Sequence, residues 1–284
     1  MSAAASDGAK TTKKSDWALV NVAAFLFNFV VVAAGRLSFL GENNRVVSNA
    51  HPTLVTPAGW AMKIWIVIFL LELAFIVWQA CSVRGRSDAI TKGVGPWFAA
   101  ACVSQAAWNL AFAQELILLS AVLLPLVAAS LTIAFVRLAP YRGGGALAVL
   151  SPEYWLLHFP VGLHAGWSTA ASLVVLNMTL EAQPLSTRVA ALIISIVFAS
   201  LSATFAAFAF RGEAYACAIA WAMAAIADKG EFRHETLSAA VADGVGRAFS
   251  VLSSTLVVLG AALSIAGLFY YEARVSSEGA VSDG

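Results

Sequence analysis

The stretch YWLLHFPVGLHAGWSTAASLVVLNM, residues 154–178, decides the fold class of this 284-residue chain. It contains no Asp, Glu, Lys or Arg, and about 20 mostly apolar residues suffice to cross the hydrocarbon core of a membrane as a helix. Gly162 and Gly166 lie one turn apart, a spacing that lets a second helix approach closely. Pro160 frees a backbone carbonyl and permits a kink. The stretch therefore predicts a membrane-spanning helix that can pack closely against a neighbour.

Seven further apolar runs flank this stretch. They are residues 17–34, 59–83, 97–113 and 116–138 before it, and residues 187–210, 213–227 and 247–271 after it. Hydrophobic residues make up 60% of the chain and charged residues 12%, whereas a soluble domain is about half apolar and about a quarter charged. These values exclude a soluble enzyme, a nucleic-acid-binding protein and a disordered chain. We predict an all-α fold, a polytopic integral membrane bundle of about eight helices within the lipid bilayer.

The spans divide the chain into four predicted parts. Residues 1–16 are a disordered polar tail without a cleavable signal, 17–178 a five-helix core, 179–274 a three-helix extension and 275–284 a second disordered tail. Ten basic residues fall on the side of the N-terminus and six on the opposite side, which favours both termini in the cytoplasm. The turn between the third and fourth spans must be tight. The seventh span is short for a full crossing, so a re-entrant segment is an alternative for it.

Ionisable side chains inside a membrane are costly and need a reason. Glu72 lies at the middle of the second span, whereas Lys63 lies near its start and can extend to the interface. Helical periodicity places Glu72 on one stripe with aromatic and amide groups, which should face the bundle interior: Met62, Trp65, Phe69, Glu72, Ile76 and Gln79. Two roles stay open for Glu72, a polar group in a pocket or a neutral acid that hydrogen-bonds within the bundle.

Other polar side chains fall in the third and fifth spans. Gln105 and Asn109 are four residues apart and share one helix face, where they could line a pocket or bridge helices through hydrogen bonds. His158 and His164 are about 240° apart around a helix, so they do not form a two-ligand metal face. One of them could be an axial haem ligand, or each could hydrogen-bond within the bundle.

No catalytic constellation or metal-binding motif occurs in the sequence. The cysteines, Cys81, Cys102 and Cys217, are scattered and form no close pair, so neither a metal cluster nor a disulfide framework is predicted. We therefore predict no catalytic residues, no metal and no required cofactor.

Nine tryptophans are a large number for this chain. Trp60 and Trp155 lie near span starts, where aromatic residues favour the interface. Trp65, Trp108 and Trp167 lie deeper, and buried indoles form flat apolar walls with one donor each. They either pack within the bundle or enclose a planar ligand.

The segment 35–58 is long and rich in turn-forming residues. Long loops are more often functional covers or disordered segments than inert connectors. We predict that this segment is a mobile lid, with Asn49, His51 and Pro57 among its residues.

Several of these motifs resemble the TspO/MBR family, the tryptophan-rich sensory proteins and mitochondrial translocator proteins. The motifs are Thr56-Pro57-Ala58-Gly59-Trp60 leading into Ile64-Trp65-Ile66, the Gln105–Trp108-Asn109 region, and the stretch from Trp155 through Pro160 to Gly166-Trp167. The resemblance covers residues 17–178, and residues 187–271 look like the three-helix extension of longer members. It implies a five-helix core around a tryptophan-lined pocket that the first loop covers. It also implies tetrapyrrole ligands such as haem or protoporphyrin, and sterols in some members.

The chain departs from the family pattern at two places. The double proline of short members is Pro57-Ala58 here, and the spacing from Pro160 to Trp167 exceeds their Pro-Tyr-x-x-Trp motif. No convincing cholesterol-recognition motif closes the fifth span, so sterol binding is not expected.

These observations predict a membrane receptor or carrier that binds a flat hydrophobic ligand, a porphyrin or haem, in the first five helices. The predicted ligand-binding residues are Trp60, Trp65, Trp108, Trp155 and Trp167 as walls, with Glu72, Asn109, His158 and His164 as polar anchors. Two alternatives remain: a proton-coupled secondary transporter that uses Glu72, and a structural subunit of a larger membrane complex. A homodimer also stays open, and no nucleic-acid partner is expected. For a structural subunit, docking faces would lie on small residues of the sixth and eighth spans: Ser195, Ala199, Ser202, Ala206, Gly260, Ala261 and Ser264.

Overall fold

A computed structural model describes residues 17–37, 39, 41–81, 87–142, 149–231, 243–256 and 258, and the regular structure in them is helical. The long helices are α1 (Trp17–Arg36), α3 (Ile64–Cys81), α4 (Trp97–Ala113), α5 (Ile117–Leu138), α6 (Phe159–Met178), α7 (Leu185–Phe210) and α8 (Glu213–Lys229). Short elements are α2 (Asn44–Ala50), the 3₁₀ turns η1 (Gly59–Lys63) and η4 (Ala139–Tyr141), and the π-helical turns η3 (Ala89–Val94) and η6 (Tyr154–His158). A last, unlabelled helix covers residues 243–256.

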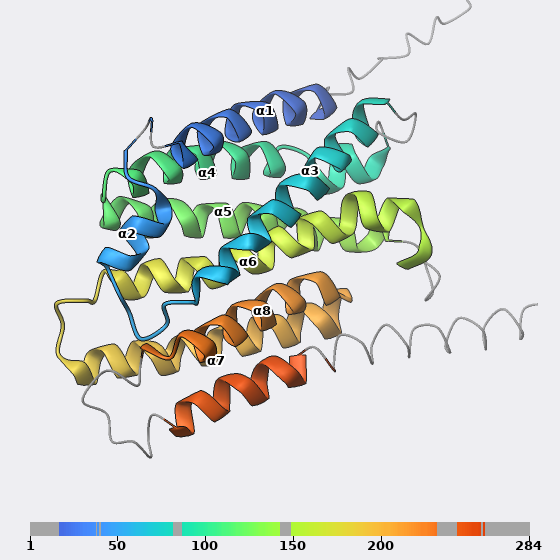
Figure 1. Cartoon of the computed structure of the whole chain (residues 1–284). Coiled ribbons are helices and arrows are strands. Elements are labelled where there is room, and N and C mark those ends of the chain that lie inside the picture. Colours follow the sequence, from blue (N-terminus) through green and yellow to red (C-terminus); the bar gives the residue numbers. More distant parts are fainter. Residues whose placement is uncertain are drawn as a thin grey trace, which may run out of the picture.

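The helices form an integral membrane bundle, as the sequence predicts. Within the described residues, five helical segments are long and apolar enough to cross a membrane: Trp17–Gly35, Gly59–Cys81, Ile117–Tyr141, Tyr154–Met178 and Leu185–Phe210. Helices α4 and α8 have 17 residues each and are therefore about 25 Å long. The start of α1 and the end of the helix at 243–256 lie at the same end of the bundle (Figure 1). We call this the α1-start end.

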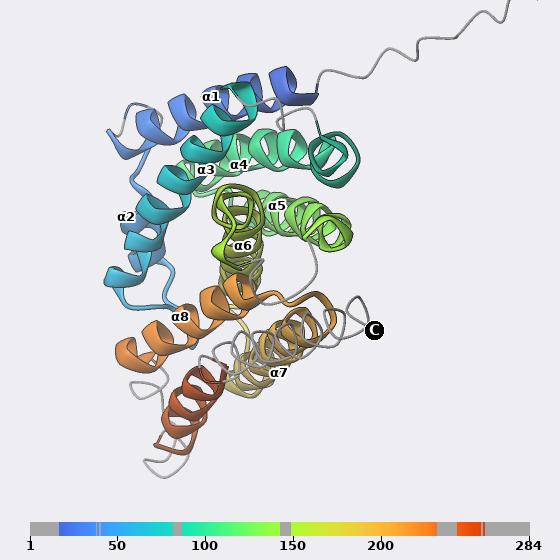
Figure 2. The same cartoon turned by 90° about the vertical axis from the view of Figure 1, so that its right-hand side faces the viewer.

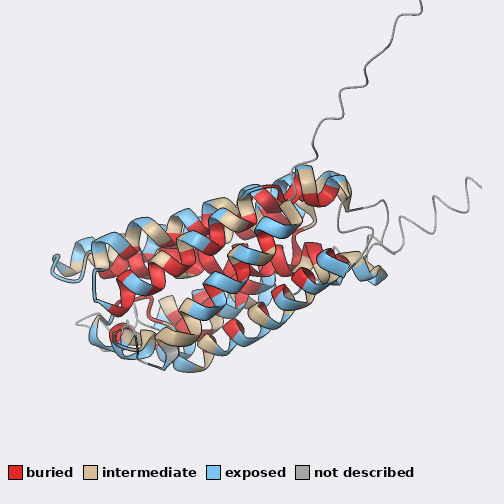
Figure 3. Cartoon of the chain, turned by 90° about the horizontal axis from the view of Figure 1, so that it is seen from above, coloured by how far each residue is buried: buried red, intermediate tan, exposed pale blue. Residues whose placement is uncertain are grey.

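Helix α6 lies at the centre of the bundle, next to α3, α5 and α8 (Figure 2). In its span 78% of the most apolar window is buried, against 22% for the span of α1. Its mean hydropathy is also lower, 1.3 against 2.1. A central helix faces protein on all sides, so it can carry polar side chains that lipid would exclude. The outer helices bury one face and expose the other (Figure 3).

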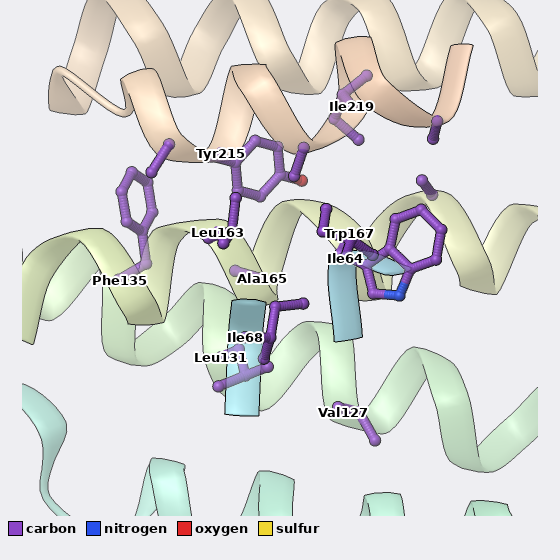
Figure 4. Close-up of a cluster of buried hydrophobic side chains, with 14 of the residues drawn as sticks. Ile64, Ile68, Val127, Leu131, Phe135, Leu163, Ala165, Trp167, Tyr215 and Ile219 are labelled. Atoms are coloured by element: carbon purple, nitrogen blue, oxygen red, sulfur yellow. The ribbon is translucent and has the colours of Figure 1, made fainter. Parts of the chain in front are cut away.

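The fifth predicted span packs closely against another helix, as its small residues predict, and that helix is α8. A Cβ atom on Gly166 would clash with the Tyr215 carbonyl and would lie 3.0 Å from the Ala218 side chain. The Tyr215 hydroxyl donates a hydrogen bond to Thr169 at 2.9 Å. Side chains of α5, α6 and α8 meet in one apolar cluster (Figure 4). The first helices of the predicted extension therefore pack into the predicted core.

Several local predictions can be compared with the structure. The turn between α4 and α5 is tight, as predicted, with Glu115 at a positive φ of 56°. The predicted stripe on α3 faces inward, because its residues are buried or half-buried. The seventh predicted span is a continuous helix, α8. Of the eighth, residues 247–256 and 258 are described and are helical.

The segment 35–58 differs from the predicted mobile loop. It contains the helix α2, and Val47, Leu54 and Val55 are almost completely buried. Asn43 caps α2 by accepting a hydrogen bond from the Arg45 backbone at 3.0 Å. The Thr53 amide donates to the Thr56 hydroxyl at 2.7 Å. Polar turn-forming residues here order the chain through local hydrogen bonds, so the segment is a packed cover.

The small residues predicted as a docking face on α7 pack inside the chain. Ser195, Ala199 and Ala206 are buried, Ser202 is half-buried, and Ser195 accepts a hydrogen bond from Asn177 at 2.9 Å. This face is therefore not free for another subunit. The corresponding residues of the eighth span, Gly260, Ala261 and Ser264, lie outside the described residues, as do both predicted tails.

Candidate functional site: a tryptophan-lined cavity

A cavity of about 400 Å³ lies in the half of the bundle opposite the α1-start end. Its walls come mainly from α3, α4, α6 and α8, with Val32 and Gly35 of α1 and Leu124 of α5, and α2 and η1 border its mouth. Cavities of about 300 to 1,000 Å³ commonly hold small molecules. The aromatic lining residues are Trp65, Phe69, Trp108, Phe112 and Trp167.

The tryptophans form rigid, flat walls. The rings of Trp65 and Trp167 pack edge to face, with centroids 6.1 Å apart, and Trp108 stacks on Phe112 at 5.3 Å. All three indoles are buried. Within the described residues, the indole nitrogens of Trp108 and Trp167 have no hydrogen-bond partner. A buried donor without an acceptor costs free energy, but both nitrogens are covered by protein atoms and do not open directly onto the cavity.

Helix α2 covers the cavity and is tied to α4. The Asn44 side chain donates a hydrogen bond to Asn109 at 3.1 Å. Asn44, Arg45 and Ser48 all line the cavity. Gln105, also in the lining, accepts a 2.6 Å hydrogen bond from Asn28 on α1. The amides of α4 thus have both predicted roles: they bridge helices and they line the pocket.

His51 joins the end of α2 to two other segments. Its Nδ1 atom lies 2.9 Å from Glu181, and its Nε2 atom lies 3.4 Å from Glu115. The hydrogen bond to Glu181, and next the one to Glu115, raise the pKa of His51 above 6.5, although partial burial opposes them. Only an imidazolium can donate from both nitrogens. His51 does not line the cavity; it fastens the cover.

Helix α8 holds the turn that leads into α3. The Trp60 indole donates to Asp228 at 2.8 Å, and the Trp221 indole donates to the Ala61 carbonyl at 3.0 Å. The rings of Trp60 and Trp221 also pack edge to face at 4.8 Å. Ala222 and Ile226 of α8 complete the wall of the cavity.

Glu72 and His164 form a buried pair one side chain away from the cavity. The Nδ1 atom of His164 lies 2.6 Å from Oε1 of Glu72, and both side chains are at most 2% exposed. The His164 ring packs edge-on against Trp65 at 5.5 Å. The pair therefore supports a wall of the cavity from behind.

Trp155 and His158 lie near the α1-start end, away from the cavity. Trp155 is 48% exposed and donates to the Val149 carbonyl at 2.8 Å. His158 borders a void of only about 10 Å³, which Arg142 and Glu213 also line. These two charged residues form a buried ion pair at 2.8 Å, and Arg142 lies 4.7 Å from the centre of the Tyr154 ring.

The structure thus separates the predicted site residues into two groups. Trp65, Trp108, Asn109 and Trp167 line one cavity, together with Pro57 of the cover. The others do not line it: Trp60, Glu72, Trp155, His158, His164, Asn49 and His51. The cavity also contains residues that were not predicted to bind a ligand, namely the cationic residues Arg45 and Lys63 and the lining residues of α8. Among the described residues no cluster of three or more His, Cys, Asp or Glu side chains could hold a metal ion.

Fold and cavity together define a polytopic helical membrane protein with an aromatic-lined internal cavity. The model of the TSPO-like protein family matches residues 18–271. The chain therefore belongs to this family, in agreement with the resemblance seen in its motifs. The match includes α7 and α8, so the extension is part of the family match. Comparisons with curated proteins and with solved structures give no significant match.

Proposed function

We propose that this membrane protein is a receptor or carrier that binds a porphyrin or haem in the tryptophan-lined cavity. Membership in the TSPO-like family supports ligand binding or transport in the membrane as the general role. The observation that carries the specific proposal is the convergence of Trp65, Trp108 and Trp167, from three helices, on one cavity.

The shape and chemistry of the walls support a planar ligand. Indole rings offer flat apolar surfaces on which a macrocycle can stack. The N–H groups of Trp108 and Trp167 have no partner among the described residues, and a rotation of either ring would offer its N–H group to an acceptor atom on the ligand. No described histidine lines the cavity, so the proposed mode of binding uses stacking and hydrogen bonds and needs no axial ligand from His158 or His164.

Titration of the purified protein in detergent with protoporphyrin IX, followed by porphyrin absorbance, tests the proposal. We expect Trp167→Leu to weaken binding by about 5- to 150-fold, because one stacking wall is worth about 1 to 3 kcal/mol. Trp155→Leu is the matched control, since this indole lies outside the cavity, and its affinity should equal that of the wild type. Equal affinity of all three proteins would refute this site.

A proton-coupled carrier is the second candidate, and the buried Glu72–His164 pair favours it. Ionisable groups inside membranes commonly serve proton transfer. In proteoliposomes, this candidate predicts porphyrin uptake that a pH gradient drives and that Glu72→Gln abolishes. Uptake that is indifferent to the gradient would remove this candidate and leave the binding proposal intact.

We also propose that the α1-start end faces the cytoplasm, because this side carries more basic residues. The cavity would then open toward the other side of the membrane. Accessibility of single cysteines at Asn49 and at Lys92 to an impermeant thiol reagent in intact cells tests this orientation: labelling of the Asn49 position alone supports it, and labelling of the Lys92 position alone reverses it.

A further inference from the structure

The mouth of the cavity carries positive charge that the apolar walls do not explain. Arg45 and Lys63 line the cavity, and among the described lining residues none is acidic. These described residues therefore give the lining a formal charge of +2. Within the described residues neither side chain forms an ion pair, since every ion pair at this end joins other groups.

Four described acidic residues of this end contact other groups, whereas Glu42 and Asp243, also at this end, lie outside the lining. Glu115 and Glu181 contact His51, Asp228 accepts from Trp60, and Glu231 pairs with Lys229. Two cations on one cavity without a counter-charge favour an anionic partner. Because no described lining residue supplies this counter-charge, the geometry points to the ligand as its source.

The charges and the indoles occupy different depths. Arg45 and Lys63 are exposed at the mouth, whereas Trp65, Trp108 and Trp167 are buried. The Arg45 guanidinium packs against the turn η1, 3.7 Å from the place where a Cβ of Gly59 would lie. The cation is therefore held beside the opening. An arginine fork matches the planar geometry of a carboxylate, and lysine adds a second point charge.

We propose that Arg45 and Lys63 bind carboxylate groups on one edge of the ligand and orient its flat apolar body toward the tryptophans. This inference rests on the proposed porphyrin site and narrows its ligand class to macrocycles with acidic side arms. Neutral planar compounds of the same size should bind less well, because they leave both cations without a counter-charge.

Protoporphyrin IX and its dimethyl ester, titrated separately in the same detergent, test the proposal. The two compounds share the macrocycle and differ in charge. We expect the wild type to prefer the acid by about tenfold at low salt, the effect of two exposed charge pairs. Added salt should reduce the preference, because it screens exposed charges.

Variants of the two cations test whether Arg45 and Lys63 cause this preference for the acid. Arg45→Gln/Lys63→Gln should bind the acid about tenfold more weakly and the ester as the wild type does; unchanged ester binding also shows that the fold is intact. Lys229→Gln removes a charge at the same end from outside the cavity lining and should keep the preference. Equal binding of acid and ester by the wild type, or a preference that survives in the double variant, overturns the inference alone. Binding of neither compound overturns the porphyrin site and this inference together.

Discussion

The charged side chains at the two ends of the bundle have opposite surroundings: at one end they are buried and paired, and at the other they are exposed beside a cavity. Near the α1-start end, Arg142 and Glu213 are buried against each other, Tyr154 covers the guanidinium, and the void beside them is about 10 Å³. At the cavity end, Arg45 and Lys63 lack ion-pair partners among the described residues, and they border the cavity of about 400 Å³.

The contrast indicates that one end of the bundle contributes stability and that the other end binds the ligand. A buried, paired charge fixes one geometry, and here it joins η4, the start of α8 and η6. Unpaired charges beside an aromatic cavity remain open to a ligand. Variants near the α1-start end should therefore change stability and leave affinity alone, and variants at the cavity end should do the reverse.

The largest expected effect comes from the buried ion pair. Glu213→Gln leaves Arg142 buried without its counter-charge, which should lower stability by about 3 to 5 kcal/mol. The measurement is the thermal midpoint in detergent. Arg142→Met/Glu213→Gln should lose less than the two single variants combined, because no unpaired charge remains. An unchanged midpoint for Glu213→Gln would show that this end is not fixed by the pair.

A smaller effect is expected where α6 and α8 touch. Gly166→Ala introduces a Cβ that meets the Tyr215 carbonyl, and such overpacking costs about 1 to 3 kcal/mol. Gly35→Ala is the control, since nothing lies within 4 Å of its Cβ. If both substitutions leave the thermal midpoint unchanged, α8 does not pack as closely on Gly166 as the contact with the Tyr215 carbonyl implies.

The smallest effect concerns the cover and pH. Glu181 and Glu115 raise the pKa of His51 above 6.5. The interactions of His51 with these two carboxylates are therefore complete below pH 6.5 and are lost as the pH rises through the raised pKa. Hydrogen-exchange protection of residues 44–51, corrected for the intrinsic effect of pH, should fall over that window. In His51→Gln the protection should be lower and independent of pH. If the protection of the wild type is as independent of pH as that of the variant, His51 does not fasten the cover through Glu181 and Glu115.

Much of the fold could be predicted from the sequence because lipid imposes a simple rule on composition. Long apolar runs and the inward stripe with Glu72 followed from length and helical period alone. Gln105 and Asn109 were predicted as bridging or pocket residues for the same reason. Helix α2 was missed because its seven residues are held by local hydrogen bonds and burial, which a turn-rich composition does not reveal.

Helical periodicity predicted which side chains face the bundle interior, but it did not predict how far along the helix axis the cavity lies. Trp155 and Trp167 both belong to the fifth span, but 12 residues separate them, which is about 18 Å along a helix. Only Trp167 reaches the cavity. The contribution of Ala222 and Ile226 depends on the close approach of α8 at Gly166, a contact between distant segments. Their small and aliphatic side chains give no sign of this role in the sequence.

The most direct test of the central claim fills the cavity. Ala171 lines it, so Ala171→Phe places a ring where the ligand would lie, whereas Ala190→Phe places the same ring on the exposed face of α7. In a titration with protoporphyrin IX, binding should be lost in Ala171→Phe and unchanged in Ala190→Phe, with both proteins folded. Wild-type affinity in a folded Ala171→Phe protein would contradict the account.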